Sequence, residues 1–257
     1  MKNSIANVQK RRSDILSIIQ EKEEASVELL CQLCDVSPST IRRDLDAMYQ
    51  MGVLTRTHGG AKLHDQSLSV SEPQELVKLR HALAKAASLY VKSGDILSFN
   101  SSQTALYVLN YLFDMNLIIV TNNVEAIRLH HDTTSTLIMT GGEIRLPKEA
   151  MVGDIAINSI TNITSTISIL GCNGIDPIHG VTTENISEAK VNSFFFENTV
   201  GKRIVVADYR KIGARAPFKS VSCSMVDILI TDIFAPANIV AQLRKQGIDV
   251  IQIDPNL

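Results

Sequence analysis

Apolar residues near the start of the chain recur with the 3.6-residue period of α-helices. A first helix is expected from about residue 8, and a second over 27–33 with Ser26 as its N-cap. A third follows Ser37, with Pro38 at its first position, where the missing N–H of proline costs nothing. The positions predicted to face inward are Ile15, Leu16, Ile18, Ile19, Val27, Leu30, Cys31, Cys34, Ile41, Leu45 and Met48.

The connection between the second and third helices is short, as a helix-turn-helix requires, because only Asp35 and Val36 precede Ser37. Residues 53–57 then favour a strand and 58–61 a hairpin tip, which together predict a wing. In a helix-turn-helix the first turns of the second helix meet the base edges of DNA. The residues expected to contact double-stranded DNA are Ser37, Ser39, Thr40, Arg42, Arg43, Arg56, His58 and Gly59, with the backbone amides of Gly59 and Gly60 in the wing. A small helical bundle that mediates protein contacts is the alternative.

The pattern changes after residue 63. Residues 64–73 are polar, without periodicity, and predict a linker between domains 1–63 and 74–257. A long helix is expected over 74–91, followed by short apolar runs that alternate with amphipathic stretches, which predicts an α/β domain with a mostly parallel sheet. The predicted strands are 96–99, 117–120, 136–139, 166–170, 204–207, 228–231 and 250–253, and the predicted helices are 104–113, 124–130, 155–160, 187–198 and 236–245.

Composition narrows the class of protein. A hydrophobic content of 45% with 20% charged residues indicates a globular chain with a sizeable core. No long apolar run and no signal-peptide pattern is found, so a soluble cytoplasmic protein that does not associate with membranes is expected. The net charge of −2 gives no sign of nucleic acid, so a basic surface must be local: Lys10, Arg11, Arg12, Arg42, Arg43, Arg56 and Lys62.

The four cysteines do not suggest a metal or disulfide framework. Cys31 and Cys34 form a C-x-x-C inside a predicted helix, with no second pair or histidine at ligand spacing, so half-buried helix residues are expected. Cys172 and Cys223 are expected to stay reduced. No metal or cofactor is predicted.

Small polar residues follow the predicted strands. In an open parallel sheet the carboxyl ends of the strands form the crevice where ligands bind. The segment 100–104 also opens a predicted helix, so its amides and hydroxyls favour an anion. The ligand-site residues predicted on this basis are Asn100, Ser101, Ser102, Gln103, Thr104, Thr121, Asn122, Gly141, Gly142 and Asp176. The alternative for any single loop is that polar residues are usual there.

Residues 9–63 resemble the winged helix-turn-helix of the DeoR family of bacterial transcriptional regulators. The matching motifs are Arg12 with Leu16, Thr40-Ile41-Arg42-Arg43-Asp44-Leu45, and Arg56-Thr57-His58-Gly59-Gly60-Ala61. The resemblance implies that Ser39, Thr40, Arg42, Arg43, Arg56 and His58 contact bases or phosphates. Asp44 is acidic, so it is expected to pair with Arg43 or another nearby arginine.

Residues 74–257 resemble the sensor domain of the same family, which is similar in fold to ribose-5-phosphate isomerases and glucosamine-6-phosphate deaminases. The markers are Gly94-Asp95, Thr121-Asn122-Asn123, Gly141-Gly142-Glu143, Val152-Gly153, Gly171 to Asp176, Gly180 to Glu184, Glu188 to Lys190, and Asp208 with Lys211. The resemblance implies a phosphorylated sugar as ligand, with Lys190 and Lys211 as its cations and Glu184 in the same site.

One segment departs from the family pattern. Where the family has Asp-x-Gly-Ser/Thr-Thr, this chain has Asn100-Ser101-Ser102-Gln103-Thr104. The site therefore accepts a different effector, binds one weakly, or binds none.

Two functions remain open. The first is a repressor of a carbohydrate-utilisation operon, controlled by a phosphorylated sugar or polyol, with no enzymatic activity. Reading repeated half-sites implies a homodimer or homotetramer, for which the apolar face Leu76, Leu79 and Leu83 is a candidate interface.

The second possible function is a sugar-phosphate isomerase or deaminase with an added DNA-binding module. Its acid or base would be Asp176, Glu184 or Glu188, since His179 lies in a turn.

Overall fold

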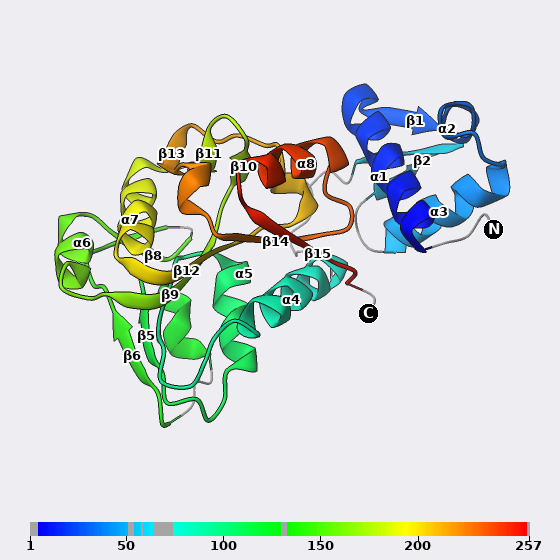
Figure 1. Cartoon of the computed structure of the whole chain (residues 1–257). Coiled ribbons are helices and arrows are strands. Elements are labelled where there is room, and N and C mark those ends of the chain that lie inside the picture. The colour runs from blue at the N-terminus through cyan, green and yellow to red at the C-terminus, as the bar shows by residue number, and fades with distance from the viewer. Residues whose placement is uncertain are drawn as a thin grey trace. The chain divides into compact units, whose positions relative to one another are not determined.

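A computed structural model describes residues 5–50, 54–57, 59–63, 74–129, 133–146 and 148–255 (Figure 1). The chain divides into two compact units, Met1–Leu79 and Arg80–Leu257. The predicted linker, 64–73, lies outside the described residues. Its role as a domain boundary stays a prediction.

Three helices, a three-stranded antiparallel sheet and the first residues of α4 (Gln74–Ser88), a helix that continues into the C-terminal unit, make up the described part of the N-terminal unit. The helices are α1 (Ile5–Lys22), α2 (Val27–Cys34) and α3 (Pro38–Gln50), and the strands are β1 (Glu24–Ser26), β2 (Leu54–Thr57) and β3 (Gly60–Leu63), in the order β1-β3-β2. The helix-turn-helix and its wing are confirmed. Strand β1 was not predicted, because three residues with only Ala25 buried are too short to show a strand period.

The core of this unit follows the predicted helical stripes. The side chains of Ile15, Leu16, Ile19, Val27, Leu30, Ile41, Leu45 and Met48 are buried, and Ile18 is half-buried. Ser26 caps α2 as expected, because its hydroxyl accepts the Leu29 N–H at 3.2 Å. Cys31 and Cys34 are half-buried, also as expected.

The C-terminal unit is built on a seven-stranded sheet, in the order β15-β14-β12-β9-β4-β5-β6, in which all neighbouring strands are parallel. Its strands are β4 (Ile96–Phe99), β5 (Ile118–Thr121), β6 (Thr136–Met139), β9 (Ser165–Gly171), β12 (Thr199–Val206), β14 (Ile228–Asp232) and β15 (Asp249–Ile253). Each corresponds to a predicted strand, so the α/β class and the parallel sheet are confirmed. The largest shift is in β12, which begins at Thr199 instead of residue 204.

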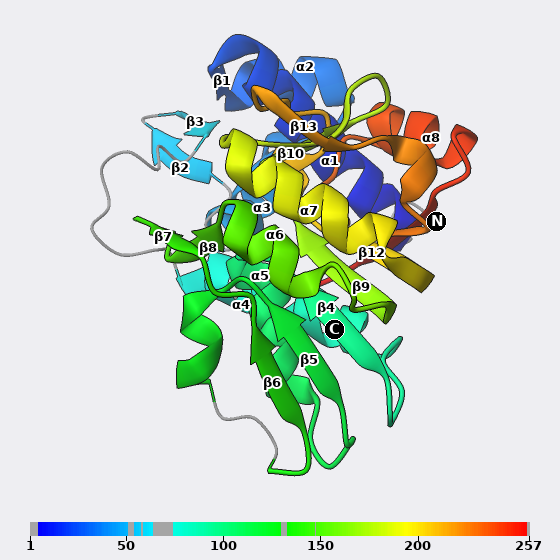
Figure 2. The same ribbon diagram turned by 90° about the vertical axis from the view of Figure 1, so that its left-hand side faces the viewer.

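Helices cover both faces of this sheet, with α7 and α8 on one side and α4 and α5 on the other (Figures 1 and 2). The bounds are α4 (Gln74–Ser88), α5 (Gln103–Leu106), α6 (Asp154–Ile160), α7 (Ile186–Glu197) and α8 (Ala237–Lys245). The 3₁₀ turns are η2 (Tyr107–Tyr111), η3 (Val124–Arg128), η4 (Tyr209–Lys211) and η5 (Cys223–Met225).

Three of the predicted helices need correction. The one expected over 104–113 is a single α-helical turn, α5, continued by the 3₁₀ turn η2, and the one over 124–130 is the 3₁₀ turn η3. Helix α4 ends at Ser88 instead of residue 91. The amides of Tyr90 and Val91 bond to the carbonyls of Ala87 and Ser88, three residues back, and this tightens the turn. Leu89, which lies just beyond the end of the helix, is 81% exposed.

The C-terminal unit also holds two small antiparallel sheets that were not predicted. Strands β7 (Glu143–Arg145) and β8 (Ala150–Val152) form a hairpin, and β10 (Gly174–Asp176), β11 (Gly180–Thr183) and β13 (Phe218–Val221) form a three-stranded sheet. These strands have three or four residues each, too few for a period-2 pattern.

The face proposed for self-association is not free. Leu76, Leu79 and Leu83 are all buried in the single chain, at 8%, 4% and 0% exposure. A partner would have to use another surface. Within the described residues, no helix is long and apolar enough to span a bilayer.

Candidate DNA interface and effector site

The first turn of α3 carries a cluster of hydroxyl groups. The Ser37 hydroxyl lies 3.0 Å from the Ser39 hydroxyl and 2.9 Å from the Thr40 hydroxyl, and it receives the Thr40 N–H at 3.4 Å. Ser37 and Ser39 are exposed. Ser37 thus caps the helix while holding two other polar side chains at the surface, where they can bond to a base or a phosphate.

Arg42 and Arg43 follow on the exposed side of the same helix, away from the buried stripe of Ile41, Leu45 and Met48. Among the described residues, neither guanidinium has an ion-pair partner. Both are therefore available to bind guanine or phosphate in the bidentate manner of arginine.

Asp44, the next residue, is buried and binds two arginines of α1. Its carboxylate accepts the Nε–H of Arg11 at 2.5 Å and that of Arg12 at 3.0 Å. The expectation of a nearby arginine is confirmed, but the partner is not Arg43. Because their side chains are only 14% and 18% exposed, Arg11 and Arg12 contribute little to the basic surface.

The wing offers fewer DNA contacts than its sequence suggests. Arg56 is half-buried and lies 3.2 Å from the exposed carboxylate of Asp46, a weak pair that DNA can replace. Gly59, at φ +91°, is exposed at the tip, while His58 lies outside the described residues. Gly60 is buried and begins the central strand β3, where it pairs with Thr57 at the base of the turn; the role predicted for its amide stays a prediction. A Cβ there would lie 2.3 Å from the Ala25 carbonyl oxygen, which only glycine avoids.

In the C-terminal unit the strand order reverses between β4 and β9. The chain runs outward through β5 and β6 on one side, and through β12, β14 and β15 on the other. Such a switch point leaves a crevice at the carboxyl ends of the two strands, where α/β proteins bind ligands.

Asn100 joins the two strands at this switch point. Its side-chain amide donates to the Gly171 carbonyl at 2.9 Å and to Asn192 Oδ1 at 3.0 Å, and its Oδ1 accepts the Gly171 N–H at 3.0 Å and the Ser102 N–H at 3.3 Å. Because every hydrogen of this amide is used within the protein, Asn100 positions the loop and has no donor left for a ligand.

The rest of the loop is arranged around Gly171. Ser102 caps α5 through the Ala105 N–H at 3.5 Å, and its hydroxyl fills the space where a Cβ at Gly171 would lie, at 1.9 Å. Ser101 and Ser102 are half-buried, Gln103 is exposed and Thr104 is buried. With only four residues in α5, the helix dipole expected to favour an anion is small.

The residues after β5 and β6 hold the β7–β8 hairpin. Asn122 is buried, donates its side-chain N–H to the Met151 carbonyl at 3.0 Å, and leaves its Oδ1 without a described partner. Thr121 is buried beside it and receives the Asn123 N–H at 3.1 Å. Gly142, at φ +103°, lies against β8, where a Cβ would meet the Val152 carbonyl oxygen at 2.6 Å; Gly141 also has positive φ. These residues attach the hairpin to the edge of the crevice.

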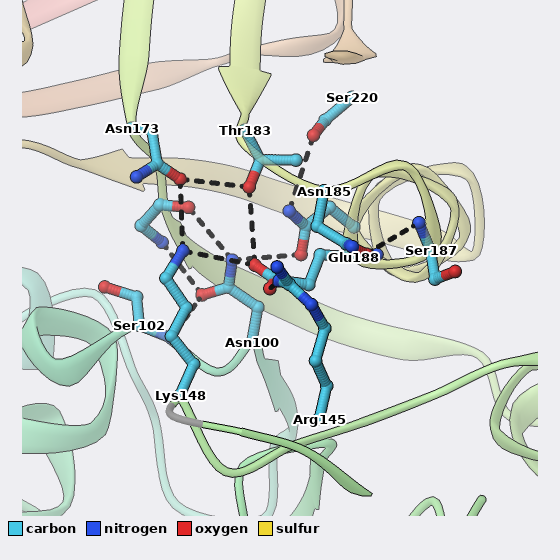
Figure 3. Close-up of polar contacts among 12 residues, drawn as sticks. Asn100, Ser102, Arg145, Lys148, Asn173, Thr183, Asn185, Ser187, Glu188 and Ser220 are labelled. Carbon is cyan, nitrogen blue, oxygen red and sulfur yellow. Dashed lines mark hydrogen bonds and ion pairs between the residues drawn. The ribbon is translucent and has the colours of Figure 1, made fainter. Parts of the chain in front are cut away.

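The hairpin brings two cations to a buried carboxylate (Figure 3). Arg145 of β7 pairs with Glu188 Oε1, and Lys148, which follows β7, lies 3.3 Å from Glu188 Oε2 and 3.3 Å from Asn173 Oδ1. The Thr183 hydroxyl lies between Asn173 Oδ1, at 3.0 Å, and Glu188 Oε2, at 3.3 Å. In Figure 3 Lys148 and Arg145 reach this cluster from the same side.

Other predicted ligand residues lie apart from this cluster. Asp176 accepts the N–H groups of Ile178 and His179 at 2.7 and 2.9 Å and faces the His179 ring at 3.0 Å. Burial raises its pKa, but these hydrogen bonds outweigh it and the pKa falls below its usual range. Glu184 is exposed. Lys190 is exposed two residues after buried Glu188, hence on the opposite face of α7.

Two buried aspartates lie at the ends of neighbouring strands β12 and β14. Asp208 binds the Arg210 guanidinium at 2.7 and 2.8 Å, and Lys211 acts on the same carboxylate, whose pKa is lowered although burial opposes this. Burial, and next the Asp208 charge, raise the pKa of Asp232 to about 7. Among the described residues, no three His, Cys, Asp or Glu side chains gather as a metal site requires.

The residues that sequence reasoning missed are Arg145, Lys148, Asn173 and Thr183. Their positions span about 40 residues and converge only through the fold. The sequence does show two basic residues, Arg145 and Lys148, shortly after Gly141-Gly142, which could have indicated an anion site. Nothing in the sequence pairs them with Glu188.

Comparison with known proteins agrees with this architecture. Residues 11–67 match the model of the DeoR-like helix-turn-helix domain, and residues 76–233 match that of the DeoR C-terminal sensor domain. The chain belongs to the DeoR family. It is therefore a DNA-binding transcriptional regulator.

Two relatives align over most of their length. The HTH-type transcriptional regulator GlpR of Haloferax volcanii is 29% identical, over 94% of this chain and 96% of the relative. The glycerol-3-phosphate regulon repressor of Escherichia coli K12 is 28% identical, over 93% and 97%. The solved structure of the sorbitol operon regulator SorC from Klebsiella pneumoniae covers 94% of this chain and 100% of its own, with 12% identity and a TM-score of 0.38, which is too low to support an inference.

Proposed function

We propose that this DeoR-family regulator represses a carbohydrate-utilisation operon and that a phosphorylated sugar or polyol controls its affinity for DNA. The observation that carries the proposal is the polar crevice at the β4–β9 switch point, where Arg145 and Lys148 supply positive charge. The name of the glycerol-3-phosphate regulon repressor, a relative over nearly the whole chain, agrees with a phosphate ester as effector class.

The DNA-reading residues proposed are those on the exposed side of α3 and on the wing: Ser37, Ser39, Thr40, Arg42, Arg43, Arg56, His58 and Gly59. Exposed hydroxyls and guanidiniums at the start of a recognition helix suit base edges and phosphates. Binding to repeated half-sites in the cytoplasm, as a homodimer or homotetramer, is part of the proposal.

Two further features are consistent with an effector at the carboxyl ends of the strands: a buried acceptor and a half-buried cation. Asn122 has an acceptor, Oδ1, without a described partner, and a buried acceptor of this kind is usually satisfied by some donor. Lys211 is half-buried near Asp208 and is retained as a second candidate cation. Lys190 faces away from Glu188, so the proposed site does not include it.

Enzymatic activity as an isomerase or deaminase is the less supported alternative. It needs a carboxylate free to move a proton. Asp176 is held by its own turn and by His179, Glu188 by two cations, and Glu184 is exposed. None of these arrangements favours proton transfer to a sugar.

A DNA-binding titration tests the proposal. The full-length protein is used to select its operator from random DNA, and affinity is measured by fluorescence anisotropy with and without a panel of sugar phosphates and their unphosphorylated parents. A change of about 5- to 150-fold with a phosphorylated compound is expected, as for typical allosteric coupling. A response to the unphosphorylated parents alone, or isomerase activity in the same samples, would contradict it. Sedimentation of the same protein should show a dimer or tetramer at micromolar concentration.

A further inference from the structure

Glu188 pairs with two cations, Arg145 and Lys148, that have unused N–H donors. Arginine carries five N–H donors and lysine three. Among the described residues, Arg145 uses one donor on Glu188, and Lys148 uses two, on Glu188 and Asn173. The remaining donors belong to side chains that are 37% and 36% exposed, so an incoming anion can reach them.

Their carboxylate partner, Glu188, is by contrast buried and held in place. Glu188 is only 4% exposed and lies in the first turn of α7, fixed by the Asn185 cap that receives its N–H at 3.0 Å. The carboxylate is therefore the stationary member of the cluster. Arg145 and Lys148 come from a two-stranded hairpin outside the main sheet, so they are the members that can change partner.

The location of the cluster is that of a ligand site. Asn173 follows β9, Thr183 ends β11, and Ser102 ends the loop between β4 and α5 (Figure 3). Two half-exposed cations, the Thr183 hydroxyl and the Asn173 side-chain amide thus gather near the carboxyl end of β9, one of the two strands at the switch point. This combination recognises a phosphate ester, with charge for the phosphate and hydrogen bonds for sugar hydroxyls.

We propose that Arg145 and Lys148 bind the phosphate of the effector and that Glu188 is an internal anion that competes with it for both cations. This inference rests on the proposed function and identifies the residues that carry it. When the effector binds, Arg145 and Lys148 exchange the Glu188 carboxylate for the phosphate of the ligand. The β7–β8 hairpin then loses its ion pairs to α7, so binding changes how the hairpin is held.

Competition between Glu188 and the ligand determines whether each variant binds phosphate more weakly or more tightly than the wild type. Removing a cation weakens phosphate binding, whereas removing the Glu188 charge strengthens it. A different role for Glu188, in which it accepts a sugar hydroxyl, predicts the reverse: E188Q would weaken binding together with the cation variants.

The experiment measures binding of inorganic phosphate and of glycerol 3-phosphate to the full-length protein by calorimetry. We expect R145Q and K148Q to weaken binding by about tenfold each, as for one charge-assisted hydrogen bond. E188Q should strengthen it, and K190Q, on the opposite face of α7, is the matched control that should leave it unchanged. Circular dichroism checks that each variant folds. If E188Q does not fold, Glu188→Asp tests the same sign, because it keeps the charge but withdraws it from both cations.

The outcomes separate this inference from the proposed function. If the wild type binds phosphate compounds and shifts its operator affinity, but R145Q and K148Q do so equally, or E188Q weakens binding, this inference is overturned while the proposed function stands. If the wild type binds its operator and responds to no phosphorylated compound, the proposed effector class fails, and this inference fails with it.

Discussion

Each unit of the molecule contains a buried carboxylate held by two cations from a different element. In the N-terminal unit Asp44 of α3 binds Arg11 and Arg12 of α1, whose side chains are 14% and 18% exposed. In the C-terminal unit Glu188 of α7 binds Arg145 and Lys148, which are at least twice as exposed, at 37% and 36%. The two clusters share their chemistry and differ in their access to water.

Access to water decides what such a cluster can do. Cations that are nearly buried would be left desolvated and unpaired if their carboxylate were lost, so the Asp44 cluster fixes α3 against α1. Half-exposed cations keep part of their hydration and can exchange one anion for another. The Asp44 cluster therefore holds two helices of the N-terminal unit together, whereas the Glu188 cluster of the C-terminal unit can exchange its anion.

The largest effect is expected from Asp44→Asn. Loss of the charge leaves two nearly buried guanidiniums without a counter-ion, which should cost about 3–5 kcal/mol and abolish operator binding. Urea denaturation followed by circular dichroism measures the change. D46N is the control, since Asp46 is 64% exposed and its pair with Arg56 is worth less than about 1 kcal/mol. Equal stability of D44N and D46N would remove the distinction between buried and exposed pairs.

Arg42 and Arg43 test the other side of the same helix. Both are exposed and unpaired among the described residues, so R42A and R43A should each weaken operator binding by about 1–3 kcal/mol without changing the melting temperature. R12A, by contrast, should lower the melting temperature. If a variant instead loses affinity evenly across DNA sequences and flattens the salt dependence by about one unit, the side chain contacts phosphate alone. Undiminished specific binding by the double variant would exclude α3 as the recognition helix.

Glu188→Gln should cost less stability than Asp44→Asn. Its two cations remain half-hydrated when the charge is removed, so a loss of about 1–2 kcal/mol is expected. The measurement is the same urea titration, run side by side on both variants. A larger loss for E188Q than for D44N would show that exposure of the cations does not control the cost.

A third buried carboxylate, Asp232, has no ion-pair partner among the described residues and extends the comparison to pH. Its pKa is raised from 3.8 to about 7 by burial and then by Asp208. Between these values the folded state binds more protons than the unfolded state, so stability should fall as pH rises from about 4 to about 7, by at most ~1.4 kcal/mol per pH unit. Asp176 and Asp208 have lowered pKa values, so their contributions are lost only as pH falls below about 4.

Urea titrations between about pH 5 and pH 7 measure this slope. Asp232→Asn removes the titrating group and should flatten it, although the variant loses some stability because one amide oxygen replaces two carboxylate oxygens that accept N–H groups from Tyr209 and Phe234. A slope unchanged in D232N would assign the pH dependence to another group.

The sequence predicted the helices and strands that have a strong period of their own. Strands such as Ile96–Phe99 and Thr136–Met139 match their predicted bounds because each is a short, mostly apolar run; the first is largely buried and the second, at the edge of the sheet, is half-buried. The partners of charged residues could not be predicted. Asp44 binds arginines 33 and 32 positions away, and Glu188 binds a hairpin about 40 positions away, contacts that only the packed fold creates. Lys190 was predicted from the family resemblance as a cation for the phosphate, and helical geometry places it on the face of α7 opposite Glu188.

Asn100 couples the ligand loop to helix α7 in a way that constrains how this chain can change. Its amide donates to the Gly171 carbonyl and to Asn192 Oδ1, and a carboxylate at the same position has no hydrogen to give either oxygen. Restoring the family's aspartate at position 100 alone would place a charge against two acceptors. A donor at position 192 would have to accompany the change, so we expect the effects of substitutions at positions 100 and 192 to be non-additive.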